Sequence, residues 1–128
     1  MICLDTHALY WWLSKDRRLP RRTRSLLDQQ PVYISSATVW ELAQLAQEGK
    51  IRFDIDIQAF LELTVAWEAL TVVDITPSIA VRATRFGPAF PRDPMDRLIT
   101  STAMELGVPL ATSDAAITRS GVVPILWD

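Results

Sequence analysis

The order of the apolar segments along the chain is the feature that most constrains its fold. Short runs that are apolar throughout, typical of β-strands, alternate with longer segments whose apolar residues recur at helical spacing. The strand candidates are residues 2–4, 32–35, 71–75, 110–112 and 123–126. Strands that are continuously apolar and separated by helices favour a parallel sheet covered on both faces. The sequence therefore predicts an α/β fold.

The helical segments and the absence of interruptions set the domain organisation. Helices are expected over residues 6–14, 21–30, 36–48, 57–70, 77 to about 87, 93–107 and 114–119. No repeat, low-complexity tract or linker divides the 128 residues. Charges interrupt every apolar stretch before the roughly 18 to 20 residues that a membrane span needs, and no leader pattern opens the chain. We therefore expect one soluble, cytoplasmic domain spanning residues 1–128, without a membrane segment.

Charge and cysteine content narrow the possible functions. The formal net charge is −2, which argues against binding nucleic acid through an overall excess of positive charge. One Cys and one His exclude a disulfide framework and a closed Cys/His zinc site built by this chain alone. Any metal ligands are therefore expected to be oxygens. Cys3, within the first predicted strand, is expected to be a small buried apolar residue.

Acidic residues follow the predicted strands or open the helices beside them. They are Asp5, Glu41, Asp93, Asp96 and Asp114. Because a parallel sheet places the carboxyl ends of its strands at one edge, most of these side chains are expected to meet there. Each also has a purely structural explanation. Three of them suit helix N-caps, Asp96 favours the positive end of a helix dipole, and residues 38–41 fit a capping box that includes Glu41.

Helix capping does not account for the shared location of these acids. Carboxylates brought together without a counter-ion repel one another, and their pKa values rise. A divalent cation removes that cost, and Mg²⁺ and Mn²⁺ prefer carboxylate and water oxygens. Such ions supply what phosphodiester cleavage needs, an activated water and stabilisation of charge on the leaving oxygen. The cluster therefore suggests metal-dependent hydrolysis of a phosphate ester.

Five short segments, taken together, resemble a known family. They are Leu4-Asp5-Thr6-His7, residues 36–41 with Trp40-Glu41, Asp93-Pro94-Met95-Asp96-Arg97-Leu98-Ile99, Thr112-Ser113-Asp114 and Val123-Pro124-Ile125-Leu126-Trp127. In this order and spacing they resemble the PIN-domain ribonucleases and, more narrowly, the VapC-type toxins of bacterial toxin–antitoxin pairs. The resemblance runs from residue 2 to residue 127.

This resemblance implies a fold and a set of site residues. The fold would be a three-layer α/β/α sandwich with a parallel sheet of about five strands. Catalytic and metal-binding roles would belong to Asp5, Glu41, Asp96 and Asp114, with Mg²⁺ or Mn²⁺ as the cofactor. Asp5 and Asp96 would be the most direct ligands, Glu41 would hold or deprotonate a water, and Asp114 would complete the site. Asp93 matches a recurrent acid of the subgroup, although we interpret it mainly as a helix cap.

Weaker substrate-binding candidates lie beside these acids. They are Thr6, Thr112, Ser113 and Arg97. The hydroxyl groups are expected to hydrogen-bond metal ligands or substrate. Arg97 is interpreted either as a phosphate contact or as a solvated helix-surface residue. His7 is interpreted as local support or a substrate contact, because a single His beside carboxylates is a weak candidate for a general base.

The activity implied by the resemblance is that of a Mg²⁺-dependent endoribonuclease, the toxin of a type II toxin–antitoxin system, cleaving RNA with a metal-activated water. Its partners would be RNA, a VapB-like antitoxin that occupies its groove, and a second copy in a homodimer. Two alternatives stay open. One is a metal-dependent phosphatase or nucleotide hydrolase on a similar sheet, although the chain lacks a GxxxxGK loop. The other is a non-catalytic binding module whose acids only cap helices.

Basic and aromatic residues complete the set of candidates. Six positive charges fall between Lys15 and Arg24, and such a run forms either a solvated face or a contact with RNA phosphates or an acidic partner. Trp11 and Trp12 cannot both point into one core, because neighbours lie about 100° apart on a helix. We expect that pair at an interface with a second copy or an antitoxin. Trp40 and Trp67 are expected in the core.

Overall fold

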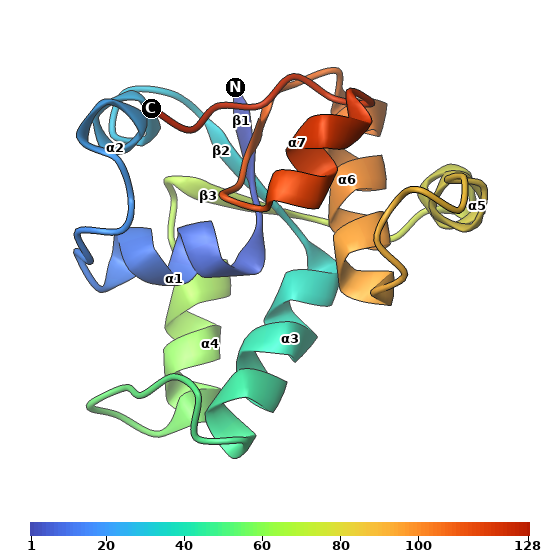
Figure 1. The fold of residues 1–128 in the computed structure, drawn as a ribbon. Helices are drawn as coiled ribbons and strands as arrows, with labels where there is room; N and C mark the ends of the chain where they lie inside the picture. The colour runs from blue at the N-terminus through green and yellow to red at the C-terminus, as the bar shows by residue number, and fades with distance from the viewer.

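The computed structural model describes all 128 residues and has a four-stranded parallel sheet with helices on both sides (Figure 1). The strands are β1 (Ile2–Leu4), β2 (Val32–Ser35), β3 (Leu70–Val73) and β4 (Leu110–Ala111). Their order across the sheet is β3-β2-β1-β4, and every pair is parallel. The predicted three-layer α/β/α sandwich is therefore confirmed.

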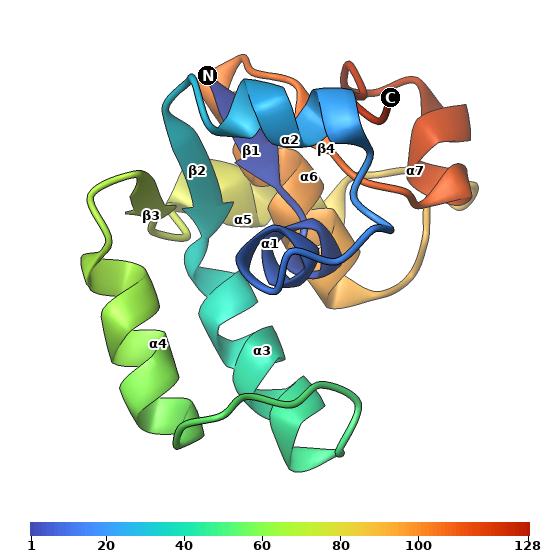
Figure 2. The ribbon, with the colours of Figure 1, turned by 90° about the vertical axis from the view of Figure 1, so that its left-hand side faces the viewer.

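Seven helices surround this sheet. They are α1 (Thr6–Leu13), α2 (Arg21–Leu27), α3 (Ser36–Gln47), α4 (Ile57–Ala66), α5 (Pro77–Thr84), α6 (Pro94–Leu106) and α7 (Ala115–Ser120). Helices α1 and α2 cover one face of the sheet, and α6 covers the other, with α5 packed outside it (Figures 1 and 2). None of these helices combines the length and apolar character that a membrane crossing requires.

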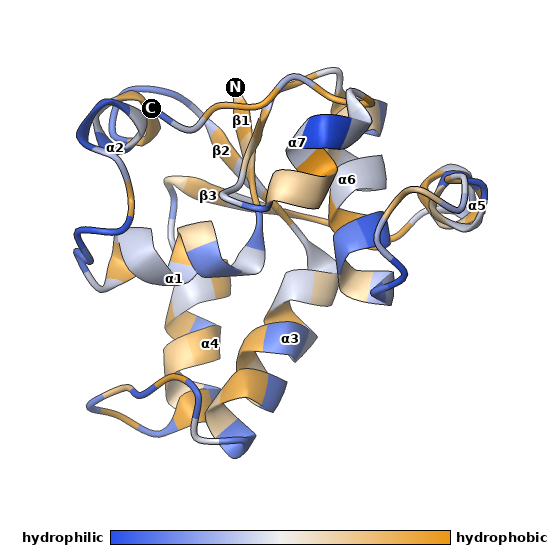
Figure 3. Ribbon diagram, in the orientation of Figure 1, coloured by the Kyte–Doolittle hydropathy of each residue, from blue (hydrophilic) through white to orange (hydrophobic).

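Strand β1 shows how the two faces divide the core. Ile2 and Leu4 belong to the apolar cluster beneath α1 and α2, whereas Cys3 belongs to the cluster beneath α6 and α7. This division follows from the alternation of side chains along a strand. Cys3 is fully buried, as predicted, and burial together with the charge of Asp5 raises the pKa of its thiol to about 12. Figure 3 shows the contrast between the apolar strands and the hydrophilic loop that follows α1.

Several predicted elements differ from the structure: one predicted strand does not form, and the helices predicted over residues 21–30, 57–70 and 77 to about 87 end earlier, at Leu27, Ala66 and Thr84. Residues 123–126 do not form a fifth strand, because only a single bridge joins Ile125 to Leu110 beside the Pro124 that lacks an N–H donor. The helix predicted over residues 57–70 ends at Ala66, because Trp67 adopts an extended backbone that leads into β3. In both places the apolar residues continue beyond the last residue of the helix or sheet, so the apolar pattern alone does not mark where the backbone hydrogen bonds of that element end.

The prediction of core positions for Trp40 and Trp67 is wrong. Trp40 is 58% exposed and Trp67 is 40% exposed. On α3 the buried side chains include Thr38 and Leu42, and Trp40 lies about 200° around the helix from both. Trp67 follows α4 and packs on Trp12, with 4.9 Å between ring centroids. Of the early pair, Trp12 is buried and Trp11 is half-buried.

Candidate metal centre at the carboxyl edge of the sheet

A polar cavity of about 240 Å³ lies where the first helical turns follow the strands. Its lining residues are Asp5, Thr6, His7, Glu41, Asp93, Asp96, Ile99, Ser113 and Asp114. The expected convergence of the acids is therefore confirmed, and five carboxyl groups face one small space. Asp5, Glu41 and Asp114 meet because β1, β2 and β4 end at the same edge, whereas Asp93 and Asp96 open α6, which begins at this edge and leads back to β4.

Three of these acids also cap helices. Asp5 accepts a hydrogen bond from the Ala8 N–H at 2.8 Å, and Asp114 accepts one from the Ile117 N–H at 2.9 Å. Asp93 accepts one from the Met95 N–H at 2.9 Å. The structural explanation predicted from the sequence thus holds for all three. Capping and lining the cavity are compatible, because each cap bond uses only one of the two oxygens of a carboxylate.

Glu41 does not belong to a capping box, which corrects the interpretation of residues 38–41. The N-cap of α3 is Ser35, whose hydroxyl accepts a hydrogen bond from the Ala37 N–H at 3.1 Å. The Thr38 hydroxyl is buried without a hydrogen-bond partner. Glu41 instead accepts a hydrogen bond from the Thr6 hydroxyl across the cavity. Its carboxylate therefore takes no part in ending or starting a helix.

Hydroxyl groups from the predicted substrate-binding set hold the acids in place. Thr6 lines the cavity and donates to Glu41, whereas the fully buried Thr112 lies behind it and donates to Asp5. The Thr112 hydroxyl also accepts a hydrogen bond from the Asp114 N–H at 3.1 Å, so it links the acids that follow β1 and β4. Ser113 lines the cavity and is exposed.

Arg97 lies outside the cavity, and neither interpretation of it from the sequence describes its contacts. Its guanidinium donates to four backbone carbonyls at 2.8 to 3.5 Å. These acceptors belong to Ala83, Phe86, Phe90 and Pro91. Arg97 therefore ties the end of α5 and the following loop to α6. One position beyond Asp96, it is rotated about 100° around the helix and away from the acids.

No Lys or Arg side chain pairs with the acids of the cavity, and the only opposing charge is that of His7, which acts to lower the pKa of Asp5 and of Glu41. The ion pairs of the protein join Arg18 to Asp16, Arg22 to Asp128, Lys50 to Glu48 and Arg82 to Glu105. None of the five cavity acids takes part in them. The cavity thus concentrates negative charge in a partly buried space, which is costly without a cation.

The pKa values of the acids reflect that imbalance. Burial, followed by the charges of Asp93 and the other cavity acids, raises the pKa of Asp96 from 3.8 to about 7. Burial also raises the pKa of Asp5 and of Glu41, although the hydroxyls of Thr112 and Thr6 act in the opposite direction. Asp93, interpreted from the sequence mainly as a cap, adds its charge to this field at Glu41 and Asp96.

The donor set fits a hydrated divalent cation. All the acidic donors are carboxylate oxygens, the ligands that Mg²⁺ and Mn²⁺ prefer. As they stand, the side chains do not bring three acids into a ready coordination shell. That spacing is compatible with Mg²⁺, which usually keeps several waters and binds through one or two carboxylates. A bound cation would also offset the repulsion that raises the pKa values.

Comparisons with known proteins assign the family. The PIN domain family model matches residues 2–122. The chain is 36% identical to Ribonuclease VapC22 of Mycobacterium tuberculosis over 114 residues, which cover 88% of this chain and 86% of that protein.

Solved structures share the fold. VapBC-1 from nontypeable Haemophilus influenzae has a TM-score of 0.69 at 19% identity, covering 98% of this chain and 97% of that chain. The FitAcB structure from Neisseria gonorrhoeae has a TM-score of 0.68 at 18% identity, covering 98% of this chain and 96% of that chain. The family match, the sequence relative and the shared fold agree with the cluster of acids at the sheet edge, and this chain belongs to the PIN domain family.

Proposed function

We propose that this protein is a Mg²⁺-dependent endoribonuclease and the toxin of a VapBC-type toxin–antitoxin system. The observation that carries the proposal is the cavity that gathers five carboxyl groups without a paired cation. Such an arrangement is a functional-site signature, because a fold gains nothing from uncompensated buried charge. RNA is the proposed substrate because the 36% identical relative is a ribonuclease.

The acids divide into proposed ligands and a proposed base. Asp5 and Asp96 would hold Mg²⁺ or Mn²⁺ most directly, and Asp114 would complete the site. The ion supplies positive charge at the phosphate and lowers the pKa of a water molecule. Glu41, held by the Thr6 hydroxyl, is proposed to orient and deprotonate the attacking water. Its raised pKa brings it closer to the operating pH at which general bases work best.

The proposed reaction is an in-line hydrolysis of the RNA backbone. A bond forms between the water oxygen and phosphorus, the bond from phosphorus to the leaving ribose oxygen breaks, and Glu41 accepts the water proton. The leaving oxygen takes up a proton from solvent. Thr6 would keep the Glu41 carboxylate aimed into the cavity through its hydrogen bond.

The non-catalytic alternative explains only part of the cavity. Helix capping accounts for Asp5, Asp93 and Asp114. Glu41 caps no helix, and Asp96 lies in the first turn of α6 without acting as its N-cap. A module whose acids served only as caps would have no reason to bury these remaining two carboxyl groups beside the others.

A protein partner is proposed on the other side of α3. Val39, Ala43, Ile57, Leu61 and Val65 line a largely apolar cavity of about 310 Å³ between α3 and α4. Val65 on α4, one of these lining residues, is 44% exposed. Contiguous exposed apolar surface of this kind marks interaction sites. Structural neighbours include toxin–antitoxin complexes such as VapBC2 from Rickettsia felis. We therefore propose that a VapB-like antitoxin binds in this cavity, and that the toxin itself forms a homodimer.

The function is tested by incubating the purified protein with RNA and Mg²⁺ or Mn²⁺. Cleavage is expected to need the metal and to stop when EDTA is added. Asp5→Asn and Asp96→Asn are expected to lower the cleavage rate about 100-fold or more, since loss of even outer-shell partners of a metal costs 10–100-fold. Asp54→Asn, in an exposed loop away from the cavity, serves as the matched control.

Substrate choice separates this proposal from the hydrolase alternative. RNA is expected to be cleaved, whereas a nucleoside triphosphate and p-nitrophenyl phosphate are expected to remain intact. Hydrolysis of the small phosphate esters without cleavage of RNA would replace the proposed function with a phosphatase. Full RNase activity in folded Asp96→Asn protein would contradict the assigned site.

A further inference from the structure

A row of aromatic side chains starts at the rim of the acidic cavity. His7 lines the cavity and is exposed. Trp11 lies one turn further along α1, about 6 Å along the helix axis. The two rings lie 5.7 Å apart between centroids and are tilted by 51°. Because His7 is exposed, its ring is accessible to another planar group.

The C-terminal segment extends this row. The Trp127 ring lies 5.9 Å from that of Trp11 between centroids, again with a tilt of 51°. The neighbouring Asp128 is fastened to α2, because the Thr23 N–H and hydroxyl donate to its carbonyl at 2.9 and 3.1 Å. Trp11 is therefore held in place by packing from the far end of the chain, and it in turn supports His7.

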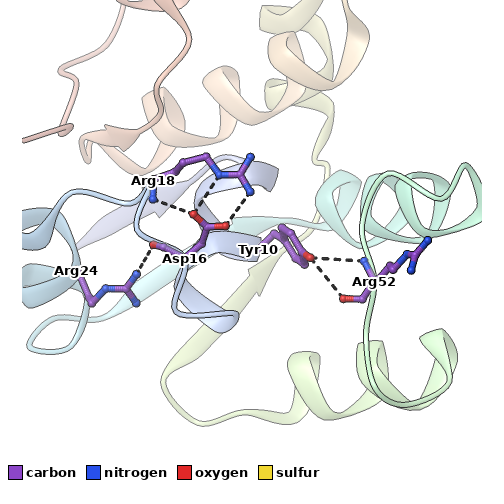
Figure 4. A network of polar contacts seen from close by, with 5 residues as sticks. All are labelled: Tyr10, Asp16, Arg18, Arg24 and Arg52. Carbon is purple, nitrogen blue, oxygen red and sulfur yellow. Dashed lines mark hydrogen bonds and ion pairs between the residues drawn. The ribbon is translucent and has the colours of Figure 1, made fainter.

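Arg18 adds a positive charge to the same surface. Its guanidinium carbon lies 4.9 Å from the centroid of the Trp11 ring, a cation–π distance. Asp16 holds Arg18 through bonds of 2.7 and 3.0 Å, and Arg24 donates to the Asp16 carbonyl at 2.7 Å (Figure 4). The loop after α1 is thus fixed, although the Arg18 side chain is 65% exposed. We call His7, Trp11, Trp127 and Arg18 the α1 track.

Further cations lie near Arg18 in the sequence. Lys15, Arg17 and Arg21 are exposed, and none of them pairs with a carboxylate. Arg22 pairs with Asp128 but stays 72% exposed. The basic run predicted from the sequence therefore divides into Arg24, which binds backbone carbonyls, and side chains whose charges face solvent. Of these, Arg18 lies on Trp11, whereas Lys15 lies beside Trp12 and Trp67.

We propose that the α1 track binds single-stranded RNA where the strand passes the cavity, with the exposed His7 ring stacking on the base next to the scissile phosphate. Aromatic faces beside cationic groups are the usual means of holding single strands, since every base has a π-face and every nucleotide a phosphate. A duplex hides its base faces and cannot stack on the track. The inference rests on the proposed function, because it requires RNA to reach the cavity.

Fluorescence of 2-aminopurine tests the stacking directly. A short single-stranded RNA of mixed sequence, carrying 2-aminopurine at each position in turn, is titrated with Asp96→Asn protein in Mg²⁺, so that binding occurs without cleavage. One position is expected to lose fluorescence on binding. Adding His7→Ala is expected to abolish that loss and to weaken the Kd about 10-fold. His7→Phe, which keeps an aromatic face, is expected to restore both.

Charge variants test the cationic half of the track. Arg18→Ala is expected to weaken binding and to reduce the slope of log K against log salt by about 0.7, the value for one phosphate contact on a single strand. Arg85→Ala, at the exposed end of α5, is the matched control and is expected to leave the slope unchanged. A duplex of the same sequence is expected to bind more weakly than the single strand.

The outcomes separate this inference from the proposed function. If wild-type protein cleaves RNA and folded His7→Ala protein binds with unchanged Kd and unchanged fluorescence, the α1 track is refuted and the nuclease proposal stands. Equal binding of the duplex and the single strand also refutes it. If the protein neither binds nor cleaves RNA with Mg²⁺ present, both proposals fail.

Discussion

Two neighbouring residues of α6, Asp96 and Arg97, carry opposite charges and have opposite surroundings. Both are half-buried. The Arg97 guanidinium meets four backbone carbonyls, which occupy its donors and join α5, the following loop and α6. The Asp96 carboxylate meets four other carboxyl groups and no cation. Adjacent positions of α6 thus hold the Arg97 guanidinium, which has hydrogen-bond acceptors around it, and the Asp96 carboxylate, which has no cation beside it.

This difference distinguishes a structural charge from a functional one. A partly buried ion that is fully hydrogen-bonded stabilises the elements that it joins, and its removal leaves acceptors unpaired. A partly buried ion without a partner destabilises the free protein, and a ligand of opposite charge reverses that effect. The comparison predicts that substitutions at the two positions change stability in opposite directions at neutral pH.

The largest change in stability is expected at Arg97. Arg97→Ala is expected to lower the free energy of unfolding by about 3 kcal/mol, because four carbonyls lose a charged donor. Arg97→Lys is expected to lie between wild type and alanine, since an ammonium keeps the charge but lacks the planar fork. Urea denaturation gives these values. Arg85→Ala serves as the exposed control. If Arg97→Ala is as stable as that control, the structural role assigned to Arg97 is contradicted.

Asp96→Asn is expected to stabilise the metal-free protein in a pH-dependent way. A folded-state pKa of about 7, above the ordinary value of 3.8, means that folding opposes ionisation of this carboxyl. Stability therefore falls as the pH rises from about 4 to about 7 and then levels off. The shift corresponds to at most roughly 4 kcal/mol, which solvent screening reduces.

The difference in Tm between Asp96→Asn and wild type, measured in EDTA, checks this prediction. The variant is expected to match or fall below wild type at pH 4 and to exceed it at pH 8. A difference that stays constant across this range would show that Asp96 is not coupled to folding through its charge.

Mg²⁺ is expected to stabilise the wild-type protein and to remove most of the advantage of Asp96→Asn. Binding to the folded state alone adds RT ln(1 + [L]/Kd), or about 1–3 kcal/mol at ten to a hundred times the Kd. Differential scanning fluorimetry at pH 8 with increasing Mg²⁺ measures the effect, and Asp54→Asn should respond like wild type. If Mg²⁺ stabilises Asp96→Asn as much as wild type, the cation does not bind at Asp96.

The smallest effect is expected where an acid has a single neutral partner. Thr6→Val removes the hydroxyl that donates to Glu41 and that lowers its pKa. The stability is expected to change by about 1 kcal/mol. The pKa of Glu41 is expected to rise, so the acidic limb of the pH profile for RNA cleavage moves to higher pH. Thr6→Ser keeps the hydroxyl and is expected to restore the wild-type profile.

Local patterns were sufficient to predict the elements that place the acids. The run Ile2–Leu4 followed by Asp5, and the Asp93-Pro94 start of α6, predict a strand end and a helix start, and the structure confirms both. Parallel topology then requires these ends to meet, which is why the sequence alone predicts the cavity acids. The caps formed by Asp5, Asp93 and Asp114 were predictable because a cap bond joins residues only a few positions apart, although the capping box predicted over residues 38–41 was wrong.

Local patterns failed where distant residues decided the outcome. Trp40 was expected in the core but lies on the exposed face of α3. The role of Arg97 depends on carbonyls up to 14 residues away, and that of Thr112 on an acid 107 residues away. Residues 123–126 had the composition of a strand but form only one bridge with β4. These contacts join residues that lie far apart in the sequence, so a short segment read alone does not reveal them.

The sequence by itself thus determined the order of strands and helices, the acids that reach the sheet edge, and the exclusion of a Cys/His metal site. Only the tertiary structure decided which charges are paired, because pairing depends on side chains brought together by packing. It left Asp96 among like charges, gave Arg97 its four carbonyls, and set Trp127 beside Trp11. Electrostatic energy depends on distance in space and on burial, and a position in the chain specifies neither.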